Sequence, residues 1–350
     1  MQVEKARAPQ NTPMEISTQA ALELAAQMED RTAFDNLVGP YRRELLIHCY
    51  RMLGSIHDAE DLVQETLVRA WEKRATFTSP GSYRAWLYRI ATNLCLNTLT
   101  RVPQRSLPLN THPQADPSQP LPPRLREPIW LEPFPDDLLA DQQIDPEYRA
   151  LQRERTTLAF LVALHHLTPT QRAILLLREV LDWSAREVAE WLNLSVPAVN
   201  SALQRARRTL HQLRMFPENT DILPTPQLQT LLDSYVTLWE QEDIPGLVAL
   251  LRDDAWFTMP PIPAWYQGRA AIATLFQTII FTTPRNWRLL PIHANASPAF
   301  GLYLWQAEKD VYQLFGLVVL NVVDEQIANT VVFLDLSCLS YFALPATLAP

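Results

Sequence analysis

The sequence predicts a multidomain protein in which two all-α domains, the second with a helix-turn-helix, precede an α+β domain. Its 350 residues suffice for two or three domains of about 100 to 200 residues each. Apolar residues recur with helical spacing up to about residue 213, whereas β-branched and aromatic runs dominate after residue 255. We therefore expect an N-terminal tail at 1–28, a helical domain at 29–101, a linker at 102–146, a helix-turn-helix domain at 147–216 and an α+β domain at 217–350.

The composition excludes several classes of protein. Apolar residues make up 47% and charged residues 19%, which is ordinary for a globular chain. No apolar run approaches the roughly 18 residues that cross a bilayer, and the N-terminus lacks the apolar core of a secretory signal, so we expect a cytoplasmic protein without a membrane partner. The three cysteines are far apart, and no glycine lies between Gly81 and Gly246. We therefore expect no metal, no cofactor, and neither a Walker loop nor a Rossmann loop.

The formal net charge of −8 is unevenly distributed. Residues 1–101 are neutral overall, 102–150 carry −4, 151–216 carry +4 and 217–350 carry −8. Because charges are screened beyond about 10 Å at moderate salt, a polyanion near residues 151–216 would meet this local positive charge.

The linker is defined by its prolines. Eleven of them lie between Pro103 and Pro146, and Pro122 and Pro123 are adjacent, which excludes a long helix or a central strand. Its apolar residues leave two interpretations open, a tethering spacer or a segment that docks on a neighbouring surface. These residues are Ile129, Trp130, Leu131, Phe134, Leu138 and Leu139.

Two amphipathic helices are predicted in the first domain. The first runs from Asp58 to Trp71, and its polar side chains form an acidic ridge. The second runs from Ser82 to Leu99, after a loop of turn residues at 78–81.

The second helix interleaves aromatic residues with arginine. Exposed aromatic side chains stack on unpaired bases while arginine holds the backbone, so the pattern favours single-stranded nucleic acid. Trp86 also fits a core position. Tyr83 and Tyr88 lie on different faces of the helix, and we expect that they are not both buried.

The basic region contains explicit helix starts. Two capping boxes are formed by Thr168 with Gln171 and by Ser184 with Glu187. A further helix begins near Ser195, and it forms a helix-turn-helix with the helix that begins at Ser184. The exposed face of the last helix combines polar side chains that read base edges with arginines that read bases or bind phosphate. The alternative is the solvated basic face of an ordinary helical hairpin.

Three segments in this order resemble bacterial sigma factors of the extracytoplasmic-function (ECF) group, the promoter-specificity subunits of RNA polymerase. The segments are Asp58 to Trp71, Ser82 to Leu94 and Leu167 to Leu210, and the resemblance covers about residues 30–101 and 150–213. It implies a sigma-2 domain that binds the polymerase clamp and the minus-10 element. It also implies a sigma-4 domain that binds the polymerase flap and the minus-35 element.

The resemblance carries roles to individual residues. The polymerase-binding residues that it implies are Asp58, Asp61, Gln64 and Glu65. The minus-10 DNA-binding residues are Phe77, Ser82, Tyr83, Arg84, Trp86, Arg89 and Asn93. The minus-35 DNA-binding residues are Pro197, Asn200, Ser201, Gln204, Arg205, Arg207 and Arg208. The chain departs from the family after Asn97, where several basic residues are usual and this sequence has only Arg101 before Pro103, so we expect weaker contacts to the minus-10 backbone.

The last region resembles the SnoaL-like members of the NTF2-like superfamily, on the motif from Met259 to Arg269. This implies a cone-shaped α+β fold with an apolar pocket. The candidate pocket residues are Trp239, Met259, Trp265, Tyr266 and His293, with Asp254 and Asp335 as further titratable candidates. One histidine without a positioned carboxylate is no evidence of acid–base catalysis, so we expect no enzyme and a regulatory domain instead.

We therefore expect a non-catalytic transcription initiation factor. Its expected partners are core RNA polymerase, through the clamp and flap, and promoter DNA, with an anti-sigma factor or a small ligand as candidates at the C-terminal domain. Two alternatives remain open. One is a helix-turn-helix regulator that binds duplex DNA as a symmetric dimer and senses a ligand, and the other is a SnoaL-like enzyme fused to a DNA-binding module.

Overall fold

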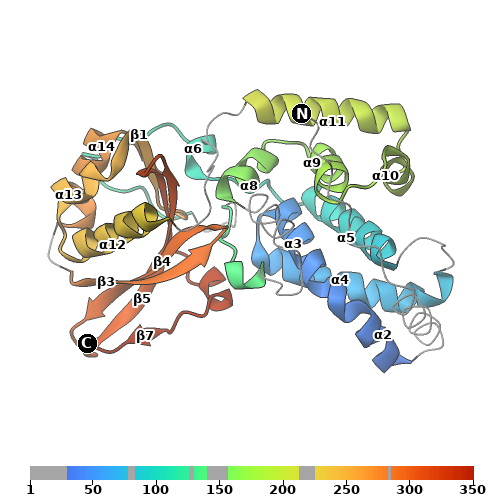
Figure 1. Ribbon diagram of the computed structural model, residues 1–350, viewed down its shortest axis with the longest axis horizontal. Coiled ribbons are helices and arrows are strands. Elements are labelled where there is room, and N and C mark those ends of the chain that lie inside the picture. The colour runs from blue at the N-terminus through green and yellow to red at the C-terminus, as the bar shows by residue number, and fades with distance from the viewer. Residues whose placement is uncertain (1–29, 78–82, 126–129, 140–156, 213–224, 283–284) are drawn as a thin grey trace.

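The computed structural model describes residues 30–77, 83–125, 130–139, 157–212, 225–282 and 285–350. The two helical domains lie side by side, the C-terminal domain lies beyond them, and the linker passes between (Figure 1). The expected N-terminal tail, Ser82, Ile129 and residues 147–156 lie outside the described residues. None of the described helices combines the length and the apolar character that crossing a bilayer requires.

The N-terminal helical domain consists of α2 (Arg31–Val38), η1 (Gly39–Tyr41), α3 (Arg42–Leu53), α4 (Ile56–Lys73), η2 (Arg74–Thr76) and α5 (Tyr83–Leu99). α3 ends where Gly54 adopts a left-handed φ of 72°. α4 begins after Ser55, whose side chain accepts a hydrogen bond from the backbone N–H of Asp58. Ala59, Val63 and Leu67 are buried, so the predicted apolar stripe of α4 is confirmed.

The linker is folded wherever the structure describes it, and it contains α6 (Pro108–Thr111) and η3 (Asp136–Leu138). Leu107 and Leu131 pack against the C-terminal domain, whereas Phe134 packs in the core of the helical domains. Trp130 and Leu139 are buried as well. The described apolar side chains of this segment are thus removed from water against domains of the same chain, so the segment that joins the helical domains also packs on neighbouring surfaces.

The helix-turn-helix domain consists of α8 (Leu158–His165), α9 (Pro169–Leu175), the π-helical turn η4 (Leu176–Val180), α10 (Ala185–Leu192) and α11 (Val196–Gln212). Both predicted capping boxes are present, at Thr168 and at Ser184. α10 ends at Asn193, which adopts a left-handed φ of 54° and turns the chain toward α11. The predicted helix-turn-helix is thus confirmed.

In its described residues the C-terminal domain combines helices with a seven-stranded sheet. Its helices are α12 (Pro226–Glu240), α13 (Ile244–Ala249), α14 (Arg269–Leu275) with the π-helical turn η5 (Phe276–Ile280), and η6 (Cys338–Tyr341). Its strands are β1 (Leu251–Thr258), β2 (Trp265–Gln267), β3 (Trp287–Ala294), β4 (Ser297–Gln306), β5 (Val311–Val323), β6 (Gln326–Phe333) and β7 (Thr347–Leu348).

The sheet has the order β2-β1-β6-β5-β4-β3, and β7 pairs with β5. β1 and β6 run parallel, and the other pairs are antiparallel. The β-branched and aromatic runs at 255–259, 300–307, 311–323 and 327–334 predict β1, β4, β5 and β6, and the pattern misses the other three described strands. β2 and β7 are too short to show an alternating pattern, and Pro291 interrupts β3, which lies at the edge of the sheet where proline is tolerated.

The two faces of the sheet have different neighbours. One face packs on α12 and α14 and forms the core of the C-terminal domain. The opposite face packs on Leu107 and Leu131 of the linker, Leu158 of α8 and Leu339 of η6. A further apolar core joins the N-terminal helical domain with the helix-turn-helix domain. The three domains are therefore packed on one another through apolar surfaces.

Candidate functional site

The acidic ridge on α4 is formed by Asp58, Asp61, Gln64 and Glu65. Asp61 and Gln64 are exposed. Glu65 accepts a hydrogen bond from Arg69 Nε at 2.6 Å, one helical turn along. Asp58 is instead bound by the linker, so the ridge is open toward the C-terminus of α4 and covered at its N-terminal end.

Arg105 of the linker holds Asp58. Its guanidinium donates to Asp58 Oδ2 at 2.8 Å, to the carbonyl oxygen of Trp130 at 3.2 Å and to Glu132 Oε1 at 3.4 Å. The Arg105 side chain is only 6% exposed, which shields these contacts from water. A buried arginine requires such partners, because an unpaired buried charge is strongly destabilising.

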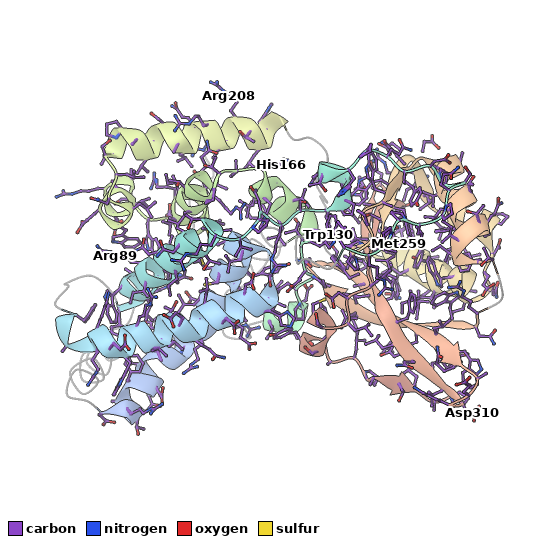
Figure 2. The ribbon with its side chains drawn as sticks, turned by 180° about the vertical axis from the view of Figure 1, so that it is seen from behind. Arg89, Trp130, His166, Arg208, Met259 and Asp310 are labelled. Atoms are coloured by element: carbon purple, nitrogen blue, oxygen red, sulfur yellow. The ribbon has the colours of Figure 1, made fainter. Side chains whose placement is uncertain are left out.

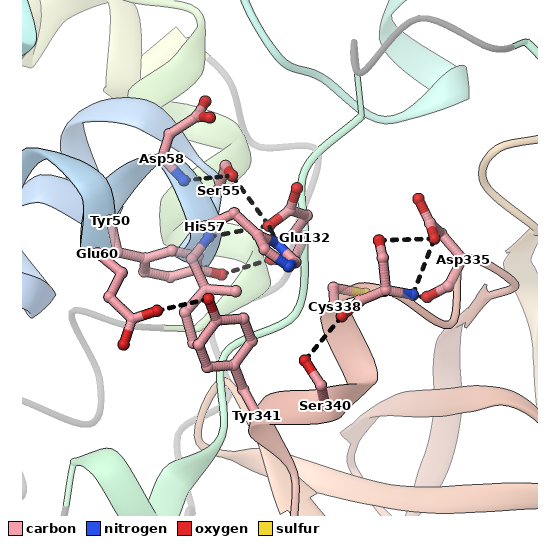
Figure 3. A network of polar contacts seen from close by, with 12 residues as sticks. Tyr50, Ser55, His57, Asp58, Glu60, Glu132, Asp335, Cys338, Ser340 and Tyr341 are labelled. Carbon is pink, nitrogen blue, oxygen red and sulfur yellow. Dashed lines mark hydrogen bonds and ion pairs between the residues drawn. The ribbon is translucent and has the colours of Figure 1, made fainter.

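Glu132 of the linker closes the N-terminus of α4 (Figure 3). Its Oε2 accepts hydrogen bonds from Ser55 Oγ and from the backbone N–H of Ile56, both at 2.9 Å, and lies 3.3 Å from His57 Nδ1. A carboxylate at this position satisfies free amides and is favoured by the positive end of the helix dipole. The linker is therefore bound to α4 through two charged residues.

Tyr341 of η6 brings the C-terminal domain to the same helix. Its hydroxyl donates to Glu60 Oε2 at 2.6 Å, and its ring packs edge-on against His57 with centroids 4.9 Å apart (Figure 3). Burial and the adjacent Glu60 carboxylate raise the pKa of Tyr341, so the phenol stays protonated and donates. No pattern along the sequence connects Glu60 with Tyr341, because 281 residues separate them.

A second group of polar contacts joins α3, the linker and the C-terminal domain. The hydroxyl of Tyr50 donates to the carbonyl oxygen of Glu132 at 2.7 Å and accepts from Asn295 Nδ2 at 3.0 Å. The Oδ1 of Asn295 accepts from the backbone N–H of Phe134 at 2.9 Å. Asn295 lies between β3 and β4, so this edge of the sheet is bound to the linker and to α3.

Tyr83 and Tyr88 are both buried, which corrects the expectation that they are not. Tyr83 packs with Phe77 and Trp86 at centroid distances of 5.0 and 5.1 Å. Tyr88 packs on the opposite side, against Trp183 of the helix-turn-helix domain at 5.0 Å. The expectation was wrong because α5 is covered on two sides, by its own domain and by the helix-turn-helix domain.

The minus-10 residues that the resemblance implies therefore divide into two groups. Arg89 and Asn93 are exposed, and Arg89 is labelled in Figure 2. Phe77 and Tyr83 are buried, Trp86 is half-buried, and Arg84 Nε donates to Glu44 Oε2 at 2.7 Å. Of these expected residues, α5 presents Arg89 and Asn93 to solvent in this conformation and keeps its aromatic residues packed.

Arg172 of α9 joins the two helical domains from inside the shared core. The side chain is fully buried, and it donates to the carbonyl oxygens of Leu164, Leu167 and Met52, the last of which lies near the end of α3. Burial lowers the pKa of Arg172 to about 9. The bond to Met52 crosses between the two domains, so separating the domains would leave a buried guanidinium donor and the Met52 carbonyl without each other as partners.

The helix-turn-helix presents all seven expected minus-35 residues to solvent. The exposed residues of α11 are Pro197, Asn200, Ser201, Gln204, Arg205, Arg207 and Arg208. Val199, Ala202, Leu203 and Ala206 are buried on the opposite face. Arg207 pairs with Glu179, whereas Arg205 and Arg208 form no ion pair with a described residue, and Arg208 extends away from the molecule (Figure 2).

The structure does not bring the five candidate pocket residues together. Trp239, Met259 and Tyr266 are buried in the core between the sheet and its helices. Trp265 packs on the other core and donates through Nε1 to the carbonyl oxygen of His112 in the linker at 2.9 Å. His293 is exposed on β3.

The two further candidates have local partners. Asp254 is paired with Arg252 at 2.9 Å, and the Oδ1 of Asp335 accepts hydrogen bonds from Ser337. Within the described ranges, no group of three or more His, Cys, Asp or Glu side chains is arranged to hold a metal ion. A cavity in this domain has a volume of about 450 Å³ and is lined in part by the linker residue Arg124.

Comparison with protein families identifies three matching parts of the chain. Residues 37–104 match the Sigma-70 region 2 model, and residues 157–210 match the Sigma-70, region 4 model. Residues 232–330 match the SnoaL-like domain. These ranges coincide with the N-terminal helical, helix-turn-helix and C-terminal domains.

Individual relatives agree with this assignment. The ECF RNA polymerase sigma factor SigG of Mycobacterium tuberculosis is 46% identical over 325 residues, which cover 91% of this chain and 86% of that protein. The crystal structure of the extracytoplasmic function sigma factor SigJ of Mycobacterium tuberculosis superposes with a TM-score of 0.56 at 18% identity, over 87% of this chain and 98% of that one, and shows the shared fold. On this identity and coverage, the chain belongs to the ECF RNA polymerase sigma factors and carries a SnoaL-like domain at its C-terminus.

Proposed function

We propose that this sigma factor binds core RNA polymerase through the acidic ridge of α4, the minus-35 element through α11 and the minus-10 element through α5. The exposed face of α11 supports its role, because it combines polar side chains that can bind base edges with Arg205 and Arg208, which form no ion pair with a described residue. We also propose that the factor acts in the cytoplasm and that its C-terminal domain regulates it without catalysing a reaction.

We further propose that the described conformation is a closed one that opens before transcription starts. The observation that carries this is the position of α9, which packs against both α5 and α11. Packed helices lie about 8 to 10 Å apart, so the axes of α5 and α11 are about 20 Å apart where they share α9. The minus-35 and minus-10 elements are roughly 25 base pairs apart, about 85 Å at 3.4 Å per base pair. One packed unit therefore does not reach both elements.

The linker and the C-terminal domain support the closed conformation at the start of the acidic ridge. Arg105 forms an ion pair with Asp58, as a basic surface of the polymerase clamp would. The hydroxyl of Tyr341 is hydrogen-bonded to Glu60. Polymerase binding at this end of α4 would compete with both contacts. We infer that core polymerase binds a minor open population and shifts the equilibrium toward it.

Reconstitution with core RNA polymerase tests the function. The purified chain is mixed with core enzyme, the complex is separated by size exclusion, and the transcripts that it starts on genomic DNA are sequenced. We expect a stable complex and transcripts that begin downstream of a common pair of promoter elements. Tight, specific duplex binding by the chain alone, without core enzyme, would instead favour a conventional helix-turn-helix regulator.

A further inference from the structure

A cavity in the C-terminal domain is formed by four separate segments of the chain. They are the linker at Arg124, the chain between β1 and β2 at Pro261, the β4–β5 hairpin, and the chain after β6 at 334–336. Its volume of about 450 Å³ lies within the roughly 300 to 1,000 Å³ that small-molecule sites occupy. None of the polymerase-binding or DNA-binding residues considered above lines this cavity.

The walls of the cavity are largely apolar. Leu304 and Phe315 come from the β4–β5 hairpin and pack against the core beneath the helices, and Leu334 belongs to that core. Pro261 forms another part of the wall. Such a surface gains free energy when an apolar body displaces water from it, at about 25 cal/mol per Å².

The polar groups of the cavity favour an anionic head group. Arg124 is the one cation among the lining residues, and it forms no ion pair with any residue that the structure describes. Asp335 also lines the cavity and carries a negative charge, and its Oδ1 accepts two hydrogen bonds from Ser337, at 2.8 and 3.0 Å, whereas Arg124 has no ion-pair partner among the described residues. Gln306 and Gln313 add amide groups that donate to an oxygen.

The placement of Arg124 is determined by backbone contacts. The N–H of Leu125 donates to the carbonyl oxygen of Pro261 at 3.0 Å, and that of Ala115 donates to the carbonyl oxygen of Trp265 at 3.0 Å. Residues 115–125 of the linker thus lie along the C-terminal domain and place Arg124 at the cavity. Residues 217–350 carry a net charge of −8, so general electrostatic attraction does not hold an anion here and a specific cation is required.

We propose that this cavity binds a small amphipathic anion, with its apolar body against Leu304 and Phe315 and its carboxylate or similar head group on Arg124. Because Arg124 belongs to the segment that joins the two promoter-reading domains, an occupied site ties the linker to the C-terminal domain. The ligand then stabilises the closed conformation and lowers transcription, a consequence that rests on the proposed function.

Calorimetric titration of the full-length chain tests the site. Decanoate is the anionic probe, and decanol and decylammonium are its neutral and cationic counterparts. We expect saturable decanoate binding at one site per chain, and weaker binding of both counterparts. Absence of decanoate binding by the folded chain, or equal binding of all three probes, would overturn the proposal.

Two variants locate the head group. Arg124→Gln should weaken decanoate binding about three- to fivefold, the size of an exposed ion pair, and leave decanol binding unchanged. Arg101→Gln, the same substitution outside the cavity, should have no effect. Gln313→Glu should weaken decanoate binding and strengthen decylammonium binding. An Arg124→Gln chain that binds decanoate as the parent chain does would place the head group elsewhere and overturn the assignment.

Transcription with core polymerase tests the consequence separately. Decanoate should reduce the transcript yield of the parent chain and not that of Arg124→Gln. If calorimetry shows the site but transcription does not respond, the coupling is overturned while the site stands. If the parent chain does not transcribe at all, the proposed function fails, and the calorimetric result still decides the ligand site.

Discussion

Asp58 and Glu60 lie two residues apart at the start of α4, yet each is bound by a different part of the chain. Asp58 is held by Arg105 of the linker at 2.8 Å, and Glu60 by Tyr341 of the C-terminal domain at 2.6 Å. Both contacts are made by side chains that no short-range pattern connects to α4. Single residues from the linker and the C-terminal domain therefore decide how much of the first turn of α4 is accessible.

Tyr341→Phe should raise the affinity for core RNA polymerase. The substitution removes the hydroxyl from Glu60 and keeps the aromatic ring beside His57. Such a hydrogen bond contributes about 1 kcal/mol, so we expect affinity to rise about fivefold when binding is measured by biolayer interferometry. Tyr312→Phe on β5 makes the same chemical change away from α4 and serves as the control. Equal affinities for the three chains would contradict a competing role for Tyr341.

The buried histidines make stability depend on pH. Burial lowers the pKa of His48 from 6.5 to about 3 and lowers that of His165 well below 6.5. Below pH 6.5 the unfolded chain therefore takes up protons that the folded chain does not, so their contribution is complete above about pH 6.5 and is lost as the pH falls. From pH 7.5 to 5.5 we expect the free energy of unfolding to fall by about 1.4 kcal/mol for each histidine.

Urea denaturation at the two pH values measures this loss. His48→Gln should remove about half of the pH dependence, and His211→Gln, at an exposed position of α11, should retain it. A His48→Gln chain with the full pH dependence would show that His48 is not the group that titrates on unfolding.

At the scale of elements, α5 and α11 differ in how many of their faces are covered. α11 buries one stripe and exposes the other, so its amphipathic pattern predicts its surface correctly. α5 packs on α3 and α4 on one side and on α9 and Trp183 on another. Apolar and aromatic residues therefore cover two of its faces. Tyr88 is covered by the helix-turn-helix domain, whereas Tyr83 and Trp86 pack with Phe77 within their own domain.

Replacing Arg205 and Arg208 by alanine should weaken dependence on the minus-35 element and leave core binding intact. Both side chains are exposed, and neither has an ion-pair partner among the described residues. Loss of two phosphate contacts should reduce the slope of log affinity against log salt by about 1.8. Gel shifts of the polymerase complex over a salt series measure this slope, and Arg252→Ala with Arg288→Ala removes the same charge from the C-terminal domain as a control. Lost core binding would mean that α11 faces the polymerase instead of DNA.

At the scale of the whole molecule, the domains form one packed unit. A common apolar core joins the two helical domains. The face of the sheet opposite α12 and α14 packs on the linker and α8. The C-terminal domain thus holds the linker, and the linker holds α4. Opening must break these contacts together, so we expect it to be a cooperative step driven by polymerase binding.

Energy transfer between two dyes measures this opening. The three native cysteines are buried, so cysteines introduced at the exposed positions Glu72 on α4 and Glu190 on α10 can be labelled selectively. We expect high transfer efficiency in the free chain and a fall of more than half when core polymerase binds. Dyes at Asp35 and Glu72, both in the N-terminal helical domain, should report no change. High efficiency in the transcribing complex would contradict the closed-to-open transition.

The sequence by itself determined the features that depend on neighbours within about four residues. The capping boxes at Thr168 and Ser184, the stripe of α4 and the exposed face of α11 follow from hydrogen bonds and helical periodicity along the chain. Only the tertiary structure decided that Tyr88 is buried, that the linker docks, and that Arg105 and Tyr341 bind the start of the acidic ridge. These contacts join residues tens to hundreds of positions apart, and their burial depends on which domain covers which surface, a property that periodicity along one segment does not contain.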